Sequence, residues 1–137
     1  MIRERFQKAI EIINKNDRGG FTVPTSKLYP HQWNWDSAFT ALGISTYNKI
    51  RAWQELILLI RAQWKNGMIP HIIFHENNPN YFPGPNHWQI KSNANTSCHS
   101  QPPVLASIIW DMVKNGNDYD LEKGQSLFNS LMAYHEW

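Results

Sequence analysis

The stretch IRAWQELILLI, residues 50–60, decides the fold class. Its apolar side chains recur at intervals of three and four residues, which places them on one face of an α-helix. The residues after it, Lys65, Asn66 and Gly67, predict the end of this helix, with Gly67 as a left-handed cap. Nowhere does an alternating pattern typical of a β-strand compete. The chain is therefore predicted to be all-α.

Four further segments have the same helical spacing. They are residues 2–13, 36–44, 104–112 and 121–137. Pro102 and Pro103 are expected in the first turn of the third of these, where a missing N–H costs nothing, and Asp120 is expected to cap the last. Five helices with alternating short and long connections predict helical hairpins stacked side by side in one domain, residues 1–137. Because the last pattern still runs at Trp137, we expect the chain to be part of something larger.

Composition excludes several classes of protein. The chain has 137 residues, 42% of them hydrophobic, and a formal net charge of +2. This hydrophobic content excludes a disordered tail, and the small charge offers no footprint for a nucleic acid or an anionic membrane. A lone cysteine, Cys98, forbids an internal disulfide and favours a reducing compartment. With no signal peptide and no apolar run of about 18 residues, the predicted location is the cytoplasm.

Aromatic and imidazole side chains gather in the non-helical parts. The chain has seven Trp and six His, many of them between Tyr29 and Gln101. Residues 68–100 show no sustained period and exceed the roughly 12 to 15 residues of an ordinary connection, which predicts a binding loop. Within it, residues 81–88 are rich in aromatics and turn formers, typical of a semi-rigid flap from which Tyr81 or Trp88 could close over a ligand. The alternative is a surface loop that buries its own aromatic side chains.

The segment YPHQWNWDS, residues 29–37, sets three aromatics, two amides and a carboxylate at the entry to a helix. Sugars are bound by this mixture, because their C–H faces stack on Trp or Tyr and their paired hydroxyls bond to planar Asp, Asn and Gln groups. The alternative is structural: Asp36 or Asn34 caps the helix, and the tryptophans belong to the core. The residues alone leave both open.

Two other chemistries are weighed. A metal-dependent enzyme built on His71, His75 and His99 is one alternative, although the segment around His71 lacks helical character and the glutamate of the zinc-protease signature. A thiol nucleophile at Cys98 with His99 as base is disfavoured, because adjacent side chains seldom face each other and no third group is evident. Neither a metal nor a cofactor is expected.

Four segments, taken in order, carry a family resemblance. They are YPHQWNWDSAF (residues 29–39), QWKNGMIPH (63–71), YFPGP (81–85) and TSCHSQPP (96–103). Together they resemble the start of the catalytic domain of glycoside hydrolase family 63 and its mannosylglycerate and glucosylglycerate hydrolase relatives. The resemblance spans residues 20–137. Cys98 and His99 depart from the smaller, more apolar residues expected there.

The resemblance implies an incomplete six-hairpin (α/α)6 toroid and an inverting α-glycosidase acting on a small α-glucoside or α-mannoside, such as a glycosylglycerate. It implies that Trp35 and Asp36 bind the glycone sugar, with Asp36 gripping hydroxyls. Gln101 matches the glutamine that also reaches the glycone subsite. The remaining implied site residues are Tyr29 and Trp33, which shape the pocket, and Tyr81, which lies in a mobile lid.

The resemblance places no catalytic residue in this chain. Inversion needs a carboxylic acid and an opposed carboxylate, roughly 6.5 to 9.5 Å apart. Both are implied to lie beyond Trp137, so the isolated chain is expected to be inert. The alternative is a non-catalytic carbohydrate-binding or interaction remnant. Expected partners are a small saccharide and, since truncated arrays expose apolar faces, a second copy or the missing part of the barrel.

Overall fold

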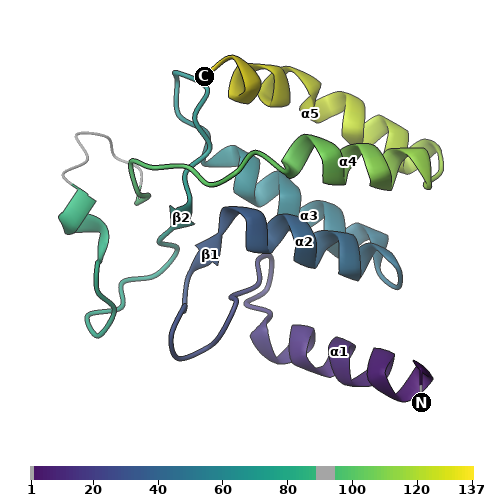
Figure 1. The fold of residues 1–137 in the computed structure, drawn as a ribbon, viewed down its shortest axis with the longest axis horizontal. Helices are drawn as coiled ribbons and strands as arrows, with labels where there is room; N and C mark the ends of the chain where they lie inside the picture. The colour runs from purple at the N-terminus through teal and green to yellow at the C-terminus, as the bar shows by residue number, and fades with distance from the viewer. Residues whose placement is uncertain (1, 89–94) are drawn as a thin grey trace.

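The computed structural model describes residues 2–88 and 95–137, and within these ranges the chain forms five α-helices (Figure 1). The helices are α1 (Ile2–Asn16), α2 (Asn34–Ser45), α3 (Lys49–Arg61), α4 (Leu105–Lys114) and α5 (Asp118–Glu136). Two short strands, β1 (Gln32–Trp33) and β2 (Ile72–Ile73), and a 3₁₀ helix, η1 (Pro85–Trp88), complete the described elements. The all-α prediction with five helices is confirmed. None of the described helices combines the length and the apolar character needed to cross a bilayer.

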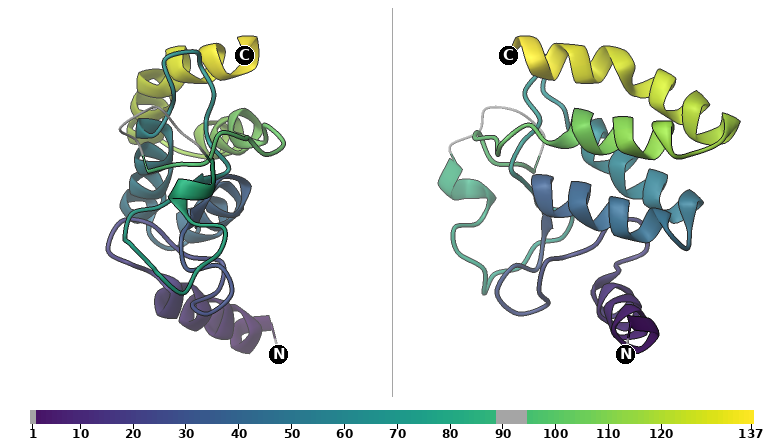
Figure 2. Two further views of the ribbon diagram at one scale, coloured as in Figure 1. Left: turned by 90° about the vertical axis from the view of Figure 1, so that its left-hand side faces the viewer. Right: turned by 45° about the vertical axis from the view of Figure 1, so that its right-hand side comes forward.

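The helices pair as two hairpins. Short connections join α2 to α3 and α4 to α5, so that each pair is antiparallel, and α2 also packs on α4 while α3 packs on α5. The core between them contains Trp53, Leu56 and Leu105, all fully buried. Figure 2 shows α1 at the edge opposite α5, inclined to the other helices. The predicted stacking of helical hairpins is therefore confirmed.

A buried carboxylate ties α3 to the beginning of α5. Asp120 is 1% exposed and accepts hydrogen bonds from Trp53 Nε1 at 2.8 Å and Lys49 Nζ at 2.6 Å. Burial alone would raise the pKa of Asp120, but the bonds from Lys49, Trp53 and the Asn117 backbone lower it below 3.8. The predicted cap at Asp120 is wrong: the N-cap is Asn117, and Asp120 stands at the third helical position of a capping box.

Two other predicted helix ends are also wrong. Helix α3 ends at Arg61 with Ala62 as its C-cap, so Gly67 is not the cap but belongs to a separate turn, in which its φ is 96°. Helix α4 begins at Leu105 with Val104 as N-cap, and both prolines therefore precede it. In each case the long apolar pattern located the helix, while its ends depend on local contacts that the pattern does not contain.

The predicted binding loop contributes to the interior. Its first part, residues 68–74, is buried except for His71, which is half-buried. Strand β2 lies within this part and pairs antiparallel with β1, with Trp33 opposite Ile72. A strand of two residues is too short to leave an alternating sequence pattern. Residues 89–94 of the loop lie outside the described residues. The pairing brings this loop to the end of the molecule where α2 begins and α5 ends (Figure 1).

Candidate sugar-binding site at the amino end of α2

A cavity of about 420 Å³ opens in front of the first turn of α2. Its lining consists of Pro24, Thr25, Tyr29, Trp33, Trp35, Asp36 and Gln101. A neighbouring hollow of about 460 Å³ shares Trp35 and Asp36 with it. Five of the six site residues predicted from the sequence therefore line one cavity, although Gln101 is 66 residues from Trp35 in the chain.

Gln101 is bound directly to the start of α2. The backbone N–H of Trp35 donates to Gln101 Oε1 at 3.0 Å, which satisfies one of the free donors at the helix amino terminus. Since the carbonyl end of this side chain is engaged, its NH₂ group is the donor that Gln101 can offer a ligand. The Trp35 side chain is 40% exposed, so an indole face is available for stacking beside that donor.

Asp36 supplies the carboxylate of the cavity. Burial raises its pKa above 3.8, while hydrogen bonds from its own backbone N–H and from the Trp35 side chain act in the opposite direction. The position in the first turn of α2 favours a negative charge. Neither Asp36 nor Asn34 caps the helix, because the N-cap is Trp33, whose side chain forms no capping bond. The capping alternative is therefore wrong, and the remaining lone pairs of the Asp36 carboxylate can accept from paired hydroxyls.

Tyr29 and Trp33 form one wall of the cavity. Their rings meet edge to face, 5.3 Å apart and at 87°. The Trp33 ring also contacts His71 at 5.3 Å, and its buried Nε1 has no hydrogen-bond partner within residues 2–88 and 95–137. This wall thus contains a buried indole donor without a partner among the described residues.

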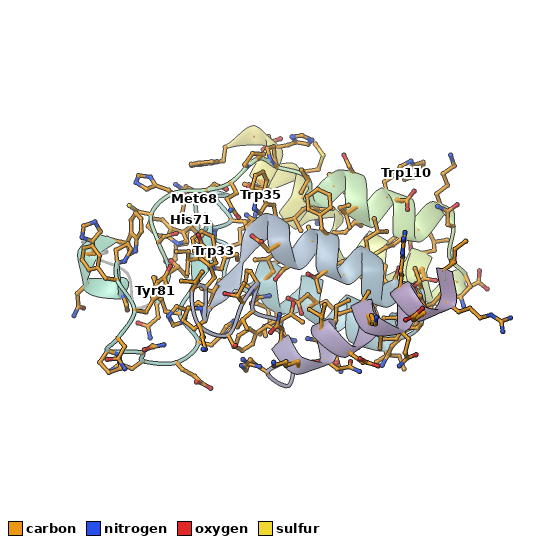
Figure 3. The ribbon with its side chains drawn as sticks, turned by 60° about the horizontal axis from the view of Figure 1, so that its bottom comes forward. Trp33, Trp35, Met68, His71, Tyr81 and Trp110 are labelled. Atoms are coloured by element: carbon orange, nitrogen blue, oxygen red, sulfur yellow. The ribbon has the colours of Figure 1, made fainter. Side chains whose placement is uncertain are left out.

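Tyr81 lies elsewhere. It lines a separate cavity of about 650 Å³, and its ring packs on His31 at 4.8 Å. Burial, with the nearby Tyr29 adding to it, raises the pKa of Tyr81 above 10.0. Figure 3 shows Tyr81 at the same end of the helices as Trp33 and Trp35 but apart from them. The structure therefore does not bring Tyr81 into the cavity of the other five.

His71, considered above as a metal ligand, is a neighbour of the cavity through its contact with Trp33. Its ring lies between Trp33 and Trp88, and its Nδ1 is 2.6 Å from Ser97 Oγ. Burial lowers the pKa of His71, a bond to the His99 carbonyl opposes this, and the nearby His99 ring adds to the lowering. The ring is thus favoured in its neutral form beside the indole of Trp33.

The metal alternative gains no support from the positions of the histidines. His75 Nε2 is 2.7 Å from Gln32 Oε1, and its ring stacks on Phe21 with centroids 3.9 Å apart. The rings of His71 and His99 are 6.3 Å apart. Across the described part of the chain, no three His, Cys, Asp or Glu side chains gather as metal ligands would.

Two buried residues that support the lining of the cavity, Glu55 and Tyr134, were not predicted from the sequence. Glu55 is fully buried and accepts from Ser37 Oγ and Gln32 Nε2, which flank the segment carrying Trp33, Trp35 and Asp36. Its only signal in the sequence is an acidic residue inside the strongest apolar run. Tyr134, near the end of α5, bonds to Asn34 and to Gln101 and gave no such signal.

Comparison with known proteins identifies relatives over most of the chain. The model of the mannosylglycerate hydrolase MGH1-like glycoside hydrolase domain matches residues 29–137. The chain is 46% identical over 135 residues to a mannosylglycerate hydrolase of Thermus thermophilus, covering 95% of this chain and 32% of that protein. It is 35% identical over 148 residues to a glucosylglycerate hydrolase of Mycolicibacterium hassiacum, covering 95% and 32%.

Solved structures agree. The family 63 mannosylglycerate hydrolase from Thermus thermophilus in complex with Tris superposes with a TM-score of 0.90 at 45% identity, covering 96% of this chain and 32% of that one. The same enzyme in complex with glucose gives 0.79 at 44% identity, covering 96% and 34%. The chain spans about a third of the length of these relatives. The match over residues 29–137, which include four of the α-helices and most of the cavity, shows that the chain belongs to the mannosylglycerate hydrolase MGH1-like glycoside hydrolase family.

Proposed function

We propose that residues 1–137 are the N-terminal part of a single (α/α)6 glycoside hydrolase domain, and that they supply the sugar-binding part of an inverting α-glycosidase. The observation that carries the proposal is the convergence of Tyr29, Trp33, Trp35, Asp36 and Gln101 on one cavity. The names of the relatives, mannosylglycerate and glucosylglycerate hydrolases, support a small α-mannoside or α-glucoside such as a glycosylglycerate as substrate. Solved complexes of one relative with glucose, and with Tris and D-glycerate, support ligands of this size.

Each lining residue has a role suited to a pyranose. The Asp36 carboxylate accepts from two adjacent hydroxyls, and the NH₂ group of Gln101 donates to a third. The Trp35 indole stacks on the C–H face of the ring, while Tyr29 and Trp33 shape the wall. Tyr81 is proposed to act as part of the lid loop, from the separate cavity of about 650 Å³ that it lines, rather than from within the cavity of the other five residues.

Replacing Asp36 with asparagine is expected to weaken the binding of D-glucose about tenfold or more, because a charge-assisted bond to a hydroxyl contributes about 1.5–3 kcal/mol. The fluorescence of the site tryptophans, titrated with D-glucose, measures the affinity. Asp111→Asn, at an exposed position on α4, is the matched control and should bind as the parent does. L-glucose tests stereochemical selectivity. Equal responses to both enantiomers, or equal affinities of the Asp36 variant and the parent, would contradict the proposal.

The isolated chain is proposed to bind without turnover. Asp36 is the one carboxylate among the described lining residues of the cavity, whereas inversion requires two on opposite faces of the sugar. Incubation with mannosylglycerate or glucosylglycerate should therefore release no reducing sugar. The alternative, a non-catalytic binding remnant, makes the same prediction for this chain. Sequencing the coding DNA after the Trp137 codon separates the two, since only the first requires further helical hairpins with acidic residues in the same frame.

The isolated chain is also proposed to associate with itself through an apolar groove between α4 and α5. The groove, about 480 Å³, is lined by Trp110, Phe128, Leu121, Met132 and further residues. The Trp110 side chain is 65% exposed and the Phe128 side chain 59%. A contiguous apolar patch of this kind on a protein surface is typical of an interaction site. Figure 3 places Trp110 far from Trp33 and Trp35. In the whole protein, the rest of the barrel is the proposed occupant.

Light scattering during gel filtration is expected to show a mass above the 16.1 kDa of one chain at high concentration. The double variant Trp110→Ser, Phe128→Ser should return the monomer mass, because it removes the apolar surface that drives association. Phe82→Ser, at a position 79% exposed outside the groove, is the control. A monomer at every concentration, or loss of association in the control alone, would rule the groove out.

The remaining assignments rest on composition. A net charge of +2 supports neither a nucleic acid nor an anionic membrane as partner. The lone Cys98 agrees with a reducing compartment, and the cytoplasm is the proposed location.

A further inference from the structure

We propose that Tyr134 is a positioning residue of the cavity: its hydroxyl group holds Gln101 against the first turn of α2. The consequence for sugar binding rests on the function proposed above. Tyr134 lies in the last turn of α5, is 6% exposed, and does not line the cavity itself. It can therefore act on a ligand only through the residues that it binds.

Three groups meet at the Tyr134 hydroxyl. It donates to the backbone carbonyl of Gln101 at 3.0 Å, Asn34 Nδ2 donates to it at 3.3 Å, and Ser100 Oγ is also within hydrogen-bond distance. These partners come from α2 and from the segment before α4, which are 66 residues or more apart in sequence. A single side chain thus joins three parts of the chain that the backbone does not connect locally.

Two hydroxyl hydrogens, those of Tyr134 and Ser100, serve this cluster. Ser100 Oγ lies near the Tyr134 oxygen and also 2.7 Å from the Ile69 carbonyl, and the Tyr134 oxygen lies 3.0 Å from the Gln101 carbonyl. In the proposed arrangement Tyr134 donates to Gln101, and the two lone pairs of the Tyr134 oxygen receive one N–H of Asn34 and the hydroxyl of Ser100. The second N–H of Asn34 goes to the carbonyl of Ile69 at 3.2 Å. The Tyr134 hydroxyl is therefore used to its full capacity, which is the arrangement expected of a buried polar group that fixes geometry.

The result is a closed ring of hydrogen bonds around Gln101. Tyr134 holds its backbone carbonyl, and the Trp35 backbone N–H holds its side-chain oxygen at 3.0 Å. The ring closes through the covalent link between Trp35 and Asn34, because Asn34 binds the same Tyr134 oxygen. With both ends fixed, the carboxamide of Gln101 has one orientation, in which its NH₂ group is the end not bound to Trp35.

A purely structural role for Tyr134 makes a different prediction. The ring of Tyr134 is part of the hydrophobic core and stacks on Trp137 with centroids 6.4 Å apart. Phenylalanine at this position keeps the ring and removes only the oxygen. If the ring alone matters, Tyr134→Phe should resemble the parent; if the hydroxyl positions Gln101, the change should appear first at the Trp35 amide.

The test is amide hydrogen exchange by NMR on the full chain, comparing the parent, Tyr134→Phe and Tyr119→Phe. Tyr119 is also on α5, and its hydroxyl takes no part in the cluster, so it controls for loss of a phenol oxygen from this helix. We expect exchange of the Trp35 amide to be about fivefold faster or more in Tyr134→Phe, the factor that corresponds to one hydrogen bond. Exchange at Leu56, in the centre of α3, should rise less, because global unfolding would accelerate both equally.

D-glucose titration of the same three proteins gives the second readout, with an expected loss of affinity of about fivefold in Tyr134→Phe alone. Equal exchange of Trp35 in the two variants would overturn the positioning role, as would equal acceleration at Trp35 and Leu56. Unchanged affinity in Tyr134→Phe would overturn its consequence for the cavity. If the parent binds no D-glucose, the proposed function fails, and the exchange ratio alone decides whether Tyr134 holds Gln101.

Discussion

Replacing Glu55 with alanine is expected to lower the free energy of unfolding by about 3–5 kcal/mol, the range for removing one partner of a buried ionic cluster. Glu55 is fully buried on α3, and its Oε1 accepts from Thr22 N at 3.1 Å and from Gln32 Nε2 at 3.3 Å, as well as from Ser37 Oγ. Its Oε2 accepts from Arg51 at 2.9 Å. Alanine would remove the acceptor of Thr22 N and Ser37 Oγ in a buried region, while Gln32 and Arg51 would keep only their bonds to the backbone carbonyl of residue 55 and to Asp17.

Glutamine at position 55 should be much less harmful. Burial raises the pKa of Glu55 above 4.5, against the lowering effect of the bonds from Ser37, Thr22 and Arg51. Because burial disfavours the charged form of Glu55, we expect the stabilisation to come from its carboxyl oxygens as hydrogen-bond acceptors rather than from its charge. Glu55→Gln keeps one such oxygen and is expected to lose about 1–2 kcal/mol. A loss equal to that of alanine would show that the charge, not the acceptor, holds the cluster.

The pH dependence has a defined sign. A carboxyl group whose pKa is raised by folding contributes stability that is fully present below its unfolded pKa and is lost as the pH rises through the folded value. Glu55→Gln lacks this titration. The advantage of the parent over this variant should therefore be larger at about pH 4 than at about pH 8. The other carboxylates, including Asp120, titrate alike in both proteins and cancel in the difference.

Urea unfolding, followed by tryptophan fluorescence, measures these changes at both pH values. Glu122→Ala is the matched control, since the Glu122 side chain is 71% exposed and pairs only with Lys123 among the described residues. It should change the unfolding free energy by about 0.5 kcal/mol or less. A similar loss in the Glu55 and Glu122 variants would contradict the assigned role of the buried cluster.

Helical spacing predicted five helices and their pairing, because a long apolar face must be buried whatever its surroundings. It did not predict the helix ends. At α5 the cap is set by bonds between Asn117 and Asp120, and Asp120 is in turn fixed by Lys49 and Trp53 on α3. Such contacts between distant residues leave no mark on a local pattern, so a plausible cap three residues too late was indistinguishable from the real one.

In the candidate site, too, the residues that are close in sequence could be predicted, while those that depend on contacts between distant residues could not. Tyr29, Trp33, Trp35 and Asp36 stand together in the sequence, where their mixture of side chains left a sugar site and a structural role both open, and the family resemblance favoured the sugar site. Their role in binding stays a prediction. The supporting residues could not be found in this way, because Tyr134 sits at an apolar position of a helix and its polar function depends on a hydroxyl meeting residues up to 100 positions away. Tyr81 was placed in a lid over the site, and this role also stays a prediction; its ring packs on His31 and lines a separate cavity.

Replacing Gly67 with alanine is expected to lower the free energy of unfolding by about 3–4 kcal/mol, from two separate causes. The backbone at Gly67 has a φ of 96°, a conformation that costs an L-residue about 1–2 kcal/mol. In addition, a Cβ at this position would overlap the carbonyl oxygen of Ala133 on α5. Because that obstacle is backbone rather than a flexible side chain, the turn and α5 would have to move apart.

Gly19→Ala separates these two causes. Gly19 has a similar φ of 81°, but no atom outside its chain neighbours lies within 4 Å of a Cβ placed there. This control should lose only the share due to strain, about 1–2 kcal/mol, and the excess in Gly67→Ala then measures the close approach of the turn to α5. If urea unfolding shows equal losses of unfolding free energy in the two variants, α5 moves away from a Cβ at position 67 at no energetic cost. Since Ala133 precedes Tyr134, a displaced α5 should also accelerate exchange of the Trp35 amide, which connects the packing of this turn to the orientation of Gln101 in the cavity.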